Sequence, residues 1–483
     1  MKYFAKIVVV LLVLTWTVTA QSAIAKPAES DPGVSRVADI SIRATPQFGA
    51  LIAQAQTKGA VRVIVGLRTS YQPEGRLRNA QAIQAQRSAI SQVQDRLINE
   101  MANRNFKALK KFASIPHLVA QVDAAGLDAL ASSPNVASIT PDRLRQPSLM
   151  YSVPLIGASN AWASGYTGAG QVVAILDSGV DKTHPFLSGK VVSEACYSTT
   201  YSPDSATSLC PGSVAQSTDP GSGVPCTGSS ECIHGTHVAG IAAGKDNGSI
   251  GFSGVAKDAN IISIQIYSYF STYGLIEAYD SDILSGMERV QTLSSTYNIA
   301  AINLSLGGGT YDTQAACDGD NSAYKDMIAN LSSIGIATVI AAGNEGATNA
   351  LDAPGCVSGA ISVGATTDGS DGYPADHVSY FSDSASFLAL LAPGQNIDSS
   401  IPGGGYTTMS GTSMATPHVT GTWAVLKSAQ PSATVDRVLA VLELTGNPVT
   451  DLRNGITKPR IQVDAAAFAL LSLQQYYFPI VIR

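Results

Sequence analysis

Ser413 lies in a local sequence that suits a serine nucleophile. It follows Gly411-Thr412 and opens a small-residue and apolar stretch over 414–429 that predicts a helix. A helix N-terminus favours negative charge, and a serine hydroxyl becomes a strong nucleophile once a base removes its proton. The same tripeptide is also common turn and helix-capping chemistry, so this serine needs partners elsewhere in the chain.

Two further segments supply an acid and a base. The run over 172–176 is β-branched and predicts a strand that ends at Asp177, while His234 opens a second small-residue helix that also contains His237. The chain order Asp, His, Ser is that of subtilisin and differs from the orders of chymotrypsin and the α/β-hydrolases. From about residue 152 to 464 the chain resembles the subtilisin-like (S8) family of serine endopeptidases. The resemblance implies that Asp177, His234 and Ser413 are the catalytic residues, and we interpret His237 as a packed structural histidine.

The resemblance also implies residues that bind the substrate. Asn344 follows a predicted strand over 337–342 and matches the family's oxyanion-hole asparagine, which acts with the Ser413 backbone N–H. The segment Ser305-Leu306-Gly307 matches the stretch that pairs with extended substrate backbone. Gly343 matches one wall of the pocket for the residue before the cleaved bond.

Asp352 departs from the family pattern, which usually carries glycine at this place. The resemblance implies that its carboxylate lies at the base of the specificity pocket with Glu345 nearer the rim, and two acids there favour Arg or Lys. The alternative is a solvated loop aspartate. The expected start of the mature chain is near Gln146, directly after Arg145, and an enzyme that cleaves its own junction must accept arginine. A bond at Arg143 or further along is the alternative junction.

Length and composition favour a large α/β enzyme. The chain has 483 residues, of which 14% are charged and 45% hydrophobic, with 44 glycines, which argues against disorder or a coiled coil. The net charge is −6 and no basic cluster interleaves with aromatic residues, so nucleic acid is not an expected partner. The expected partners are protein or peptide substrates, and we expect a monomer.

Residues 1–25 have the pattern of a signal peptide. Lys2 and Lys6 flank the start of an apolar run over 7–14, and small-x-small cleavage sites end at Ala20 and Ala25. The alternative is a membrane anchor, but the run is short for a bilayer span. We therefore expect a secreted, extracellular protein with no membrane association once the signal is removed.

Residues 26–145 are expected to form a propeptide with an inhibitor-like part over about 60–142. A strand over 61–67, a helix over 79–103, strand pattern over 106–122, a helix over 124–133 and a strand over 135–139 indicate a small α+β domain of ferredoxin type. This domain resembles the inhibitory propeptide of subtilisin-like proteases, which acts as an intramolecular inhibitor. The alternative is an accessory domain that stays attached.

Residues 146–470 alternate strands with helical stretches, which predicts an α/β domain whose mostly parallel sheet is covered on both faces by helices. Asp177, Ser305 and Asn344 all follow predicted strands, where open α/β sheets place their ligand crevice. The last residues, 471–483, form a short apolar tail that fits either an edge strand or a sorting signal.

The six cysteines predict disulfides in an exported protein. They are Cys196, Cys210, Cys226, Cys232, Cys317 and Cys356, and an even count in this context favours pairing. A zinc site is the alternative, although paired C-x-x-C spacing is missing. Because the other four cluster together, we expect Cys317 to pair with Cys356.

A structural calcium ion is one interpretation of the segment over 245–251, because Asp246 and Asn247 offer hard oxygen ligands. An Asp-Asn-Gly turn explains the same residues without an ion. No cofactor is required for the chemistry.

The leading hypothesis is a secreted serine endopeptidase made as a self-processed precursor. The alternative is a catalytically silent subtilisin-fold protein that binds peptides. Silent relatives typically lose a catalytic or oxyanion-hole residue, whereas this chain keeps all four.

Overall fold

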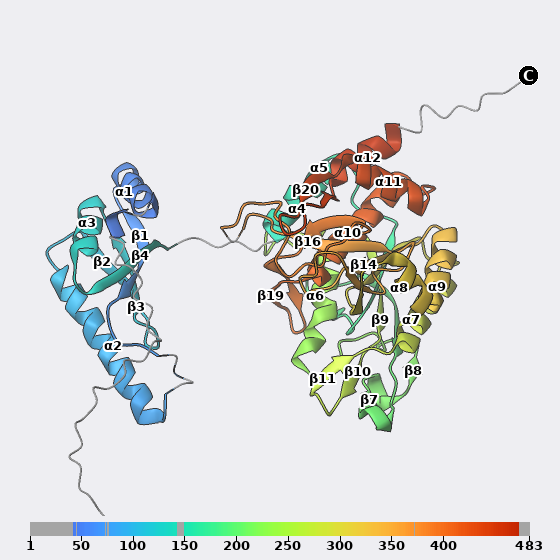
Figure 1. Ribbon diagram of the computed structural model, residues 1–483, viewed down its shortest axis with the longest axis horizontal. Helices are drawn as coiled ribbons and strands as arrows, with labels where there is room; N and C mark the ends of the chain where they lie inside the picture. Colours follow the sequence, from blue (N-terminus) through green and yellow to red (C-terminus); the bar gives the residue numbers. More distant parts are fainter. Residues whose placement is uncertain are drawn as a thin grey trace, which may run out of the picture. The chain divides into compact units, whose positions relative to one another are not determined.

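The computed structural model describes residues 42–44, 46–72, 74, 77–142, 149–370 and 372–472. The chain forms two compact units that divide between Leu144 and Arg145 (Figure 1). The expected signal segment, the junction around Arg145 and nearly all of the expected C-terminal tail lie outside the described residues. In the described part of the chain, no helix combines the length and the apolar character needed to cross a membrane.

The N-terminal unit is a four-stranded antiparallel sheet covered by helices, in the strand order β2-β3-β1-β4. Asn79 and Asp123 cap α2 and α3 by accepting hydrogen bonds from backbone N–H groups of the first turn. The β-α-β-β-α-β order is that of ferredoxin-like domains, as expected. The elements are α1 (Pro46–Lys58), β1 (Val61–Leu67), α2 (Ala80–Glu100), β2 (Phe106–Lys111), β3 (His117–Val122), α3 (Ala124–Ser132) and β4 (Val136–Pro141).

Two details of this unit differ from the sequence prediction. The single strand pattern over 106–122 is a hairpin, whose strands β2 and β3 flank a turn that contains Pro116. Proline lacks an N–H donor and interrupts a ladder, so this residue was a signal for a turn. Helix α1 was not predicted; Phe48, Leu51 and Ala55 form its buried face and join the core of the unit.

The second unit is built on a ten-stranded sheet in the order β20-β21-β17-β16-β14-β12-β5-β9-β6-β8. Seven neighbouring pairs are parallel, and only the two edge pairs, β20–β21 and β6–β8, are antiparallel. The strands are β5 (Val172–Asp177), β6 (Val191–Tyr197), β8 (Gln216–Ser217), β9 (Asn260–Gln265), β12 (Ile299–Leu304), β14 (Ala337–Ala341), β16 (Ile361–Thr366), β17 (Leu390–Pro393), β20 (Asn447–Thr450) and β21 (Thr457–Arg460).

The direction of winding changes beside β5. After β5 the chain adds β6 and β9 on one side, and then crosses to add β12, β14, β16 and β17 on the other. Such a switch point leaves a crevice outside the carboxyl ends of the strands, and ligands of open α/β sheets bind there. The carboxyl ends of β5 and β12 therefore position the site.

Helices cover both faces of this sheet (Figure 1). Along β5, Val173 and Ile175 pack into the core that contains α6 and α10, whereas Val172 and Leu176 pack into the core that contains α7 and α9. This alternation follows from the two-residue period of a strand. The helices are α4 (Leu149–Leu155), α5 (Ala158–Ala163), α6 (His234–Ala243), α7 (Asp280–Leu293), α8 (Gln314–Asp320), α9 (Ser322–Ser333), α10 (Thr412–Ala429), α11 (Val435–Thr445) and α12 (Val463–Ser472).

Three small sheets complete the unit. One joins β7 (Ala206–Ser208), β10 (Ser268–Phe270) and β11 (Leu275–Glu277), a second joins β13 (Gly308–Tyr311) and β15 (Leu351–Ala353), and a third joins β18 (Ile397–Ile401) and β19 (Gly405–Met409). The six cysteines form three disulfides, Cys196–Cys210, Cys226–Cys232 and Cys317–Cys356. The expected Cys317–Cys356 pair is therefore present, and the zinc alternative is wrong because none of the six cysteines is free.

Candidate active site

Asp177 and His234 form a hydrogen-bonded pair at the switch point. Asp177 is the last residue of β5 and fully buried, and His234 is the first residue of α6 with a side chain that is 24% exposed. His234 Nδ1 lies 2.8 Å from Asp177 Oδ1 and 3.0 Å from Oδ2. A carboxylate only accepts hydrogen bonds, so Nδ1 carries the proton and Nε2 keeps a lone pair. This is the tautomer that a general base needs.

Ser178 ties the strand that carries the acid to the helix that carries the base. Its hydroxyl donates to the Cys232 carbonyl over 3.2 Å and accepts from the Gly235 N–H over 2.9 Å. Its own N–H donates to Asp177 Oδ1 over 2.7 Å. Because these bonds are buried, the distance between the acid and the base is fixed by packing rather than by flexible side chains.

Ser413 is the second residue of α10 and lies against the segment that follows β12. Its hydroxyl donates to the Ser305 carbonyl over 3.2 Å, and the Ser305 hydroxyl donates to the Ser413 carbonyl over 2.8 Å. No hydrogen bond joins Ser413 to His234 in the described structure. Catalytic hydrogen bonds are often long or misaligned before a substrate binds, so this resting geometry does not exclude proton transfer between them.

Asn344 follows β14, and its amide is oriented by the start of α10. Asn344 Oδ1 accepts from the Thr412 N–H over 2.8 Å and from the Thr412 hydroxyl over 3.1 Å. The backbone N–H can only donate, so the oxygen end of the amide faces α10 and the NH₂ end is left for other partners. A donor held in this way, beside the N–H at a helix start, is suited to stabilise an oxyanion.

Two adjacent cavities bring these residues into one cleft. The larger, about 660 Å³, is lined by Ser413, Asn344, Leu306, Gly307 and Gly343 among others. The smaller, about 300 Å³, is lined by His234, Ser305, Glu231 and Met409, and Tyr267 and Ile276 line both cavities. The structure thus gathers every residue that the sequence analysis assigned to catalysis or to substrate binding around this cleft, except that Asp177 lies buried behind His234.

The acidic side chains Glu345 and Asp352 line the larger cavity. Asp352 lies in β15, is 3% exposed and accepts from the Thr310 hydroxyl over 3.1 Å. The solvated-loop alternative for Asp352 is therefore wrong. Burial raises the pKa of Asp352, the Glu345 carboxylate raises it further, and the Thr310 hydrogen bond lowers it, with a net pKa of about 6.

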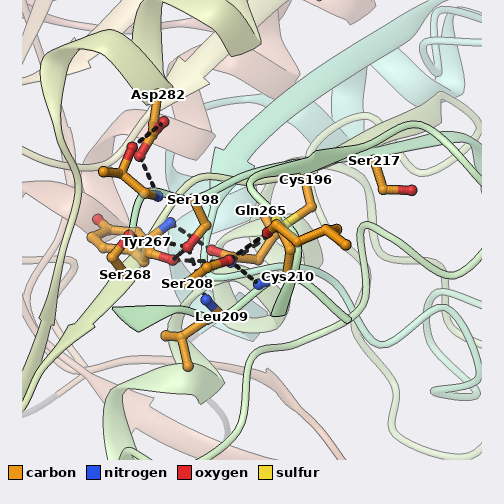
Figure 2. Close-up of a disulfide and its surroundings, with 12 residues drawn as sticks. Cys196, Ser198, Ser208, Leu209, Cys210, Ser217, Gln265, Tyr267, Ser268 and Asp282 are labelled. Carbon is orange, nitrogen blue, oxygen red and sulfur yellow. Dashed lines mark hydrogen bonds between the residues drawn. A yellow bond between two sulfur atoms is a disulfide. The ribbon is translucent and has the colours of Figure 1, made fainter. Parts of the chain in front are cut away.

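The cysteine-rich insertion over 196–232 helps to build one wall of the cleft. Its strand β7 pairs with β10, and β10 pairs with β11, which contributes Ile276 to both cavities. Figure 2 shows the Cys196–Cys210 disulfide beside Ser198, whose hydroxyl donates to the Tyr267 carbonyl over 2.8 Å. A segment this rich in Ser, Gly and Pro has little core of its own, so disulfides limit its unfolded states.

The charge around His234 sets its protonation. Burial lowers the pKa of His234, but the charge and hydrogen bond of Asp177 and the charge of Glu231 raise it, and the net pKa lies above its ordinary value. Glu231 lies three residues before His234 in the insertion, and its Oε2 accepts from the Ile276 N–H over 3.0 Å. His234 acts as a base only when it is neutral. Because its pKa is raised, we expect activity to be lost at a higher pH when the solution is acidified.

Glu231→Gln is expected to move the acid limb of the pH profile of kcat/KM to lower pH. Glutamine keeps an oxygen for the Ile276 N–H but removes the charge that stabilises protonated His234. The measurement is kcat/KM for one neutral peptide across the acid limb, with Glu443→Gln as the control because Glu443 is an exposed residue of α11. An unchanged limb, or a shift to higher pH, would contradict this role of Glu231.

His237 takes no part in the cleft. It is buried in α6, its Nε2 lies 3.0 Å from the Thr407 carbonyl oxygen, and burial lowers its pKa to about 3. It is therefore a neutral, packed histidine at the pH values where proteins function, in agreement with the sequence interpretation.

The segment proposed for calcium is organised by Asp246. The carboxylate of Asp246 accepts hydrogen bonds from the backbone N–H groups of Gly248, Ser249, Ile250 and Gly251 at 2.9–3.2 Å. Asn247 Oδ1 accepts from the Ser249 hydroxyl over 2.6 Å. These bonds account for the turn without an ion.

Several residues of the cleft were not found from the sequence. Glu231 comes from the insertion, Tyr267 directly precedes β10, and Ile276 lies in β11, which pairs with β10. Asp383 lies behind the acidic pocket, and one carboxylate oxygen each of Glu345, Asp352 and Asp383 lie within 4.8 Å of one another. Asp383 follows no strand and belongs to no motif, so nothing local marked it.

Known proteins match most of the second unit of this chain. The model of the subtilase family (Peptidase_S8) matches residues 168–460. Subtilisin E of Bacillus subtilis (strain 168) is 32% identical over 375 residues, which cover 76% of this chain and 84% of subtilisin E. The subtilisin of Bacillus pumilus is 33% identical over 301 residues, covering 62% of this chain and 91% of that protein. A solved protease structure from Pseudoalteromonas arctica PAMC 21717 matches with a TM-score of 0.53 and 25% identity, covering 66% of this chain and 94% of that chain.

The match to the family extends over more than half of the chain and spans all the cleft residues named above. This chain therefore belongs to the subtilase family, and it is a serine endopeptidase with the subtilisin fold. It acts on protein or peptide substrates.

Proposed function

We propose that this chain is a secreted serine endopeptidase that hydrolyses peptide bonds through Ser413, His234 and Asp177. Ser413 attacks the scissile carbonyl while His234 Nε2 takes its proton and later returns it to the leaving amine. Asp177 keeps the proton on Nδ1 and stabilises the imidazolium. The Asn344 amide and the Ser413 N–H stabilise the oxyanion that develops in the transition state.

The observation that carries this proposal is the buried Asp177–His234 pair beside a cleft that Ser413 and Asn344 also line. The alternative, a silent peptide-binding protein, would not need a base held in one tautomer. Purified secreted protein should hydrolyse casein, and an inhibitor that modifies active serines should abolish the activity. Peptide binding without serine-dependent hydrolysis would favour the alternative.

Export and self-processing are part of the same proposal. Three disulfides in the catalytic unit and the signal pattern over 1–25 support an extracellular location. The N-terminal unit, over about 60–142, would inhibit the enzyme until the chain is cut near Arg145. N-terminal sequencing of secreted protein reports signal removal and maturation together.

We expect a monomer with no nucleic-acid partner. Structural calcium at Asp246 and Asn247 stays a prediction, which thermal unfolding before and after chelation would test.

Asp352→Gly is expected to reduce the preference for Arg or Lys before the cut. The buried carboxylate of Asp352 lies on the same cavity as Ser413, so it can pair with a cationic side chain in that pocket. The measurement is kcat/KM for peptides that differ only in Arg or Phe before the scissile bond, with Asp312→Gly as an exposed control. If the wild type strongly prefers Phe and the ratio is unchanged in Asp352→Gly, this role of Asp352 is excluded.

A further inference from the structure

Asp383 is a buried acid with one unused carboxylate oxygen. Its side chain is 0% exposed, and its Oδ1 accepts from the Ala347 N–H over 2.7 Å. Its Oδ2 is buried and has no hydrogen-bond donor in the described part of the structure. An unpaired oxygen of this kind is costly when charged, so it requires a proton or a cation.

The unused oxygen faces the wall of the larger cavity at Gly343. This glycine has a φ of 116°, and a Cβ atom built on it would collide with Asp383 Oδ2 and lie 2.9 Å from Asp352 Cγ. A Cβ atom on Gly307 would lie 3.0 Å from Asp352 Cβ. Both glycines line the cavity that Ser413 lines. The absence of a side chain at Gly343 therefore lets the carboxylates of Asp352 and Asp383 pack against this wall, with Asp352 lining the cavity and Asp383 buried behind it.

The three carboxylates lack a basic partner within the protein. No Lys, Arg or His forms an ion pair with Glu345, Asp352 or Asp383 among the described residues. The nearby guanidinium of Arg453 donates to the Tyr380 and Ser382 carbonyls and pairs with Asp451. From β13, Thr310 offers Asp352 a neutral hydroxyl. The cluster is thus negative and uncompensated when it is fully ionised.

We propose that Asp383 is a specificity-determining residue. Its charge, from behind the pocket wall at Gly343, strengthens the binding of a Lys or Arg side chain before the scissile bond by the cavity-lining carboxylates of Asp352 and Glu345. This inference rests on the proposed function. It adds a third, buried acid that the sequence did not indicate. The ammonium or guanidinium group supplies charged donors to Asp352 and a positive charge that offsets the charge of Asp383, whose carboxylate oxygen lies within 4.8 Å of one of Asp352.

The cluster also couples substrate choice to pH. Burial raises the pKa of Asp383, the Ala347 N–H lowers it, and Glu345 and Asp352 raise it, so that the net pKa is about 7, next to about 6 for Asp352. Below these values the empty pocket holds protons, and a cationic side chain must displace them. The ratio of kcat/KM for Arg peptides to that for Phe peptides should therefore rise with pH, by up to about tenfold per pH unit for each proton released. Titration of His234 cancels in this ratio because both peptides need the same base.

Asp383→Asn tests the proposal, with Asp436→Asn as the control. Asp436 is exposed in the first turn of α11 and loses the same charge. At pH 8 we expect the Arg-to-Phe ratio of the mature enzyme to fall roughly tenfold in Asp383→Asn. The increase of this ratio should also occur at lower pH, because the loss of a like-charged neighbour lowers the pKa of Asp352. An unchanged ratio and pH profile, or an equal loss for both peptides, would overturn the proposal.

A second measurement on the wild type does not depend on how the variant folds. Benzamidine, a cation, should inhibit Phe-peptide hydrolysis competitively and more strongly at pH 8 than at pH 5.5, whereas neutral benzamide should inhibit weakly at both. Tight calcium binding that is lost in Asp383→Asn and is indifferent to benzamidine would assign the cluster to a metal ion and overturn the proposal. If no peptide is hydrolysed by a serine-dependent reaction, the proposed function itself fails. If peptides are hydrolysed but the Arg-to-Phe ratio of kcat/KM does not change with pH or in Asp383→Asn, only the proposed role of Asp383 is wrong.

Discussion

Ser413→Ala is expected to accumulate as the full precursor without its signal, and to hydrolyse no peptide. Loss of the nucleophile in subtilisin, a relative of this chain, lowers kcat by about 10⁶-fold, and we expect a similar factor here. Such a factor corresponds to about 8 kcal/mol of transition-state stabilisation. If the same site cuts the junction near Arg145, the variant cannot mature.

The same substitution should leave the fold intact. Ser413 is half-buried, and alanine removes one hydrogen bond to the Ser305 carbonyl. A bond of this kind contributes about 1 kcal/mol to stability, far less than the catalytic loss. Helix α10 keeps its start, because the Asn344 amide still accepts from the Thr412 N–H.

The measurement compares the size of the purified protein and its thermal midpoint with those of the wild type. Ser432→Ala is the control, since Ser432 is an exposed serine after the same helix. The control should mature and hydrolyse peptides as the wild type does. Efficient maturation of purified Ser413→Ala, with no other protease present, would exclude self-processing by this site.

The sequence predicted the parts of the cleft that local pattern dictates. Asp177 ends a β-branched strand, His234 and Ser413 stand at the starts of small-residue helices, and each position follows from a short periodic segment. In a parallel sheet the carboxyl ends of the strands meet at one edge, so these residues could be expected to converge before any contact was known.

Residues that depend on long-range packing were missed. Asp383 comes from an irregular segment, and long-range hydrogen bonds hold it beside Gly343: its N–H donates to the Gly343 carbonyl over 3.2 Å, and its Oδ1 accepts from the Ala347 N–H. No period in the sequence reports such a contact between residues 40 apart. The hairpin at 106–122 was missed for a different reason, since apolar residues occur on both sides of the turn and Pro116 was not taken as its signal.

Asn344 offers the second large effect, because its NH₂ group is expected to meet charge that exists only in the transition state. Asn344→Leu removes this donor at similar size. Loss of the corresponding donor in subtilisin costs about 2.7–4 kcal/mol, or about 10²–10³-fold in kcat, and we expect the same range in this relative. KM should change little, because the ground-state carbonyl gains less from the donor than the oxyanion does.

A structural cost accompanies this substitution and has to be separated from the catalytic one. Leucine leaves the Thr412 N–H, in the first turn of α10, without its acceptor, at about 1–3 kcal/mol of stability if water does not replace the amide oxygen. Asn349→Leu makes the same change at an exposed position of the same loop and serves as the control. Thermal midpoints of both variants report the structural cost, and kcat and KM measured well below those midpoints report the catalytic one. A loss that appears mainly in KM, or a kcat within a few-fold of the wild type, would mean that the oxyanion is stabilised by other donors and that the amide of Asn344 mainly supports the start of α10.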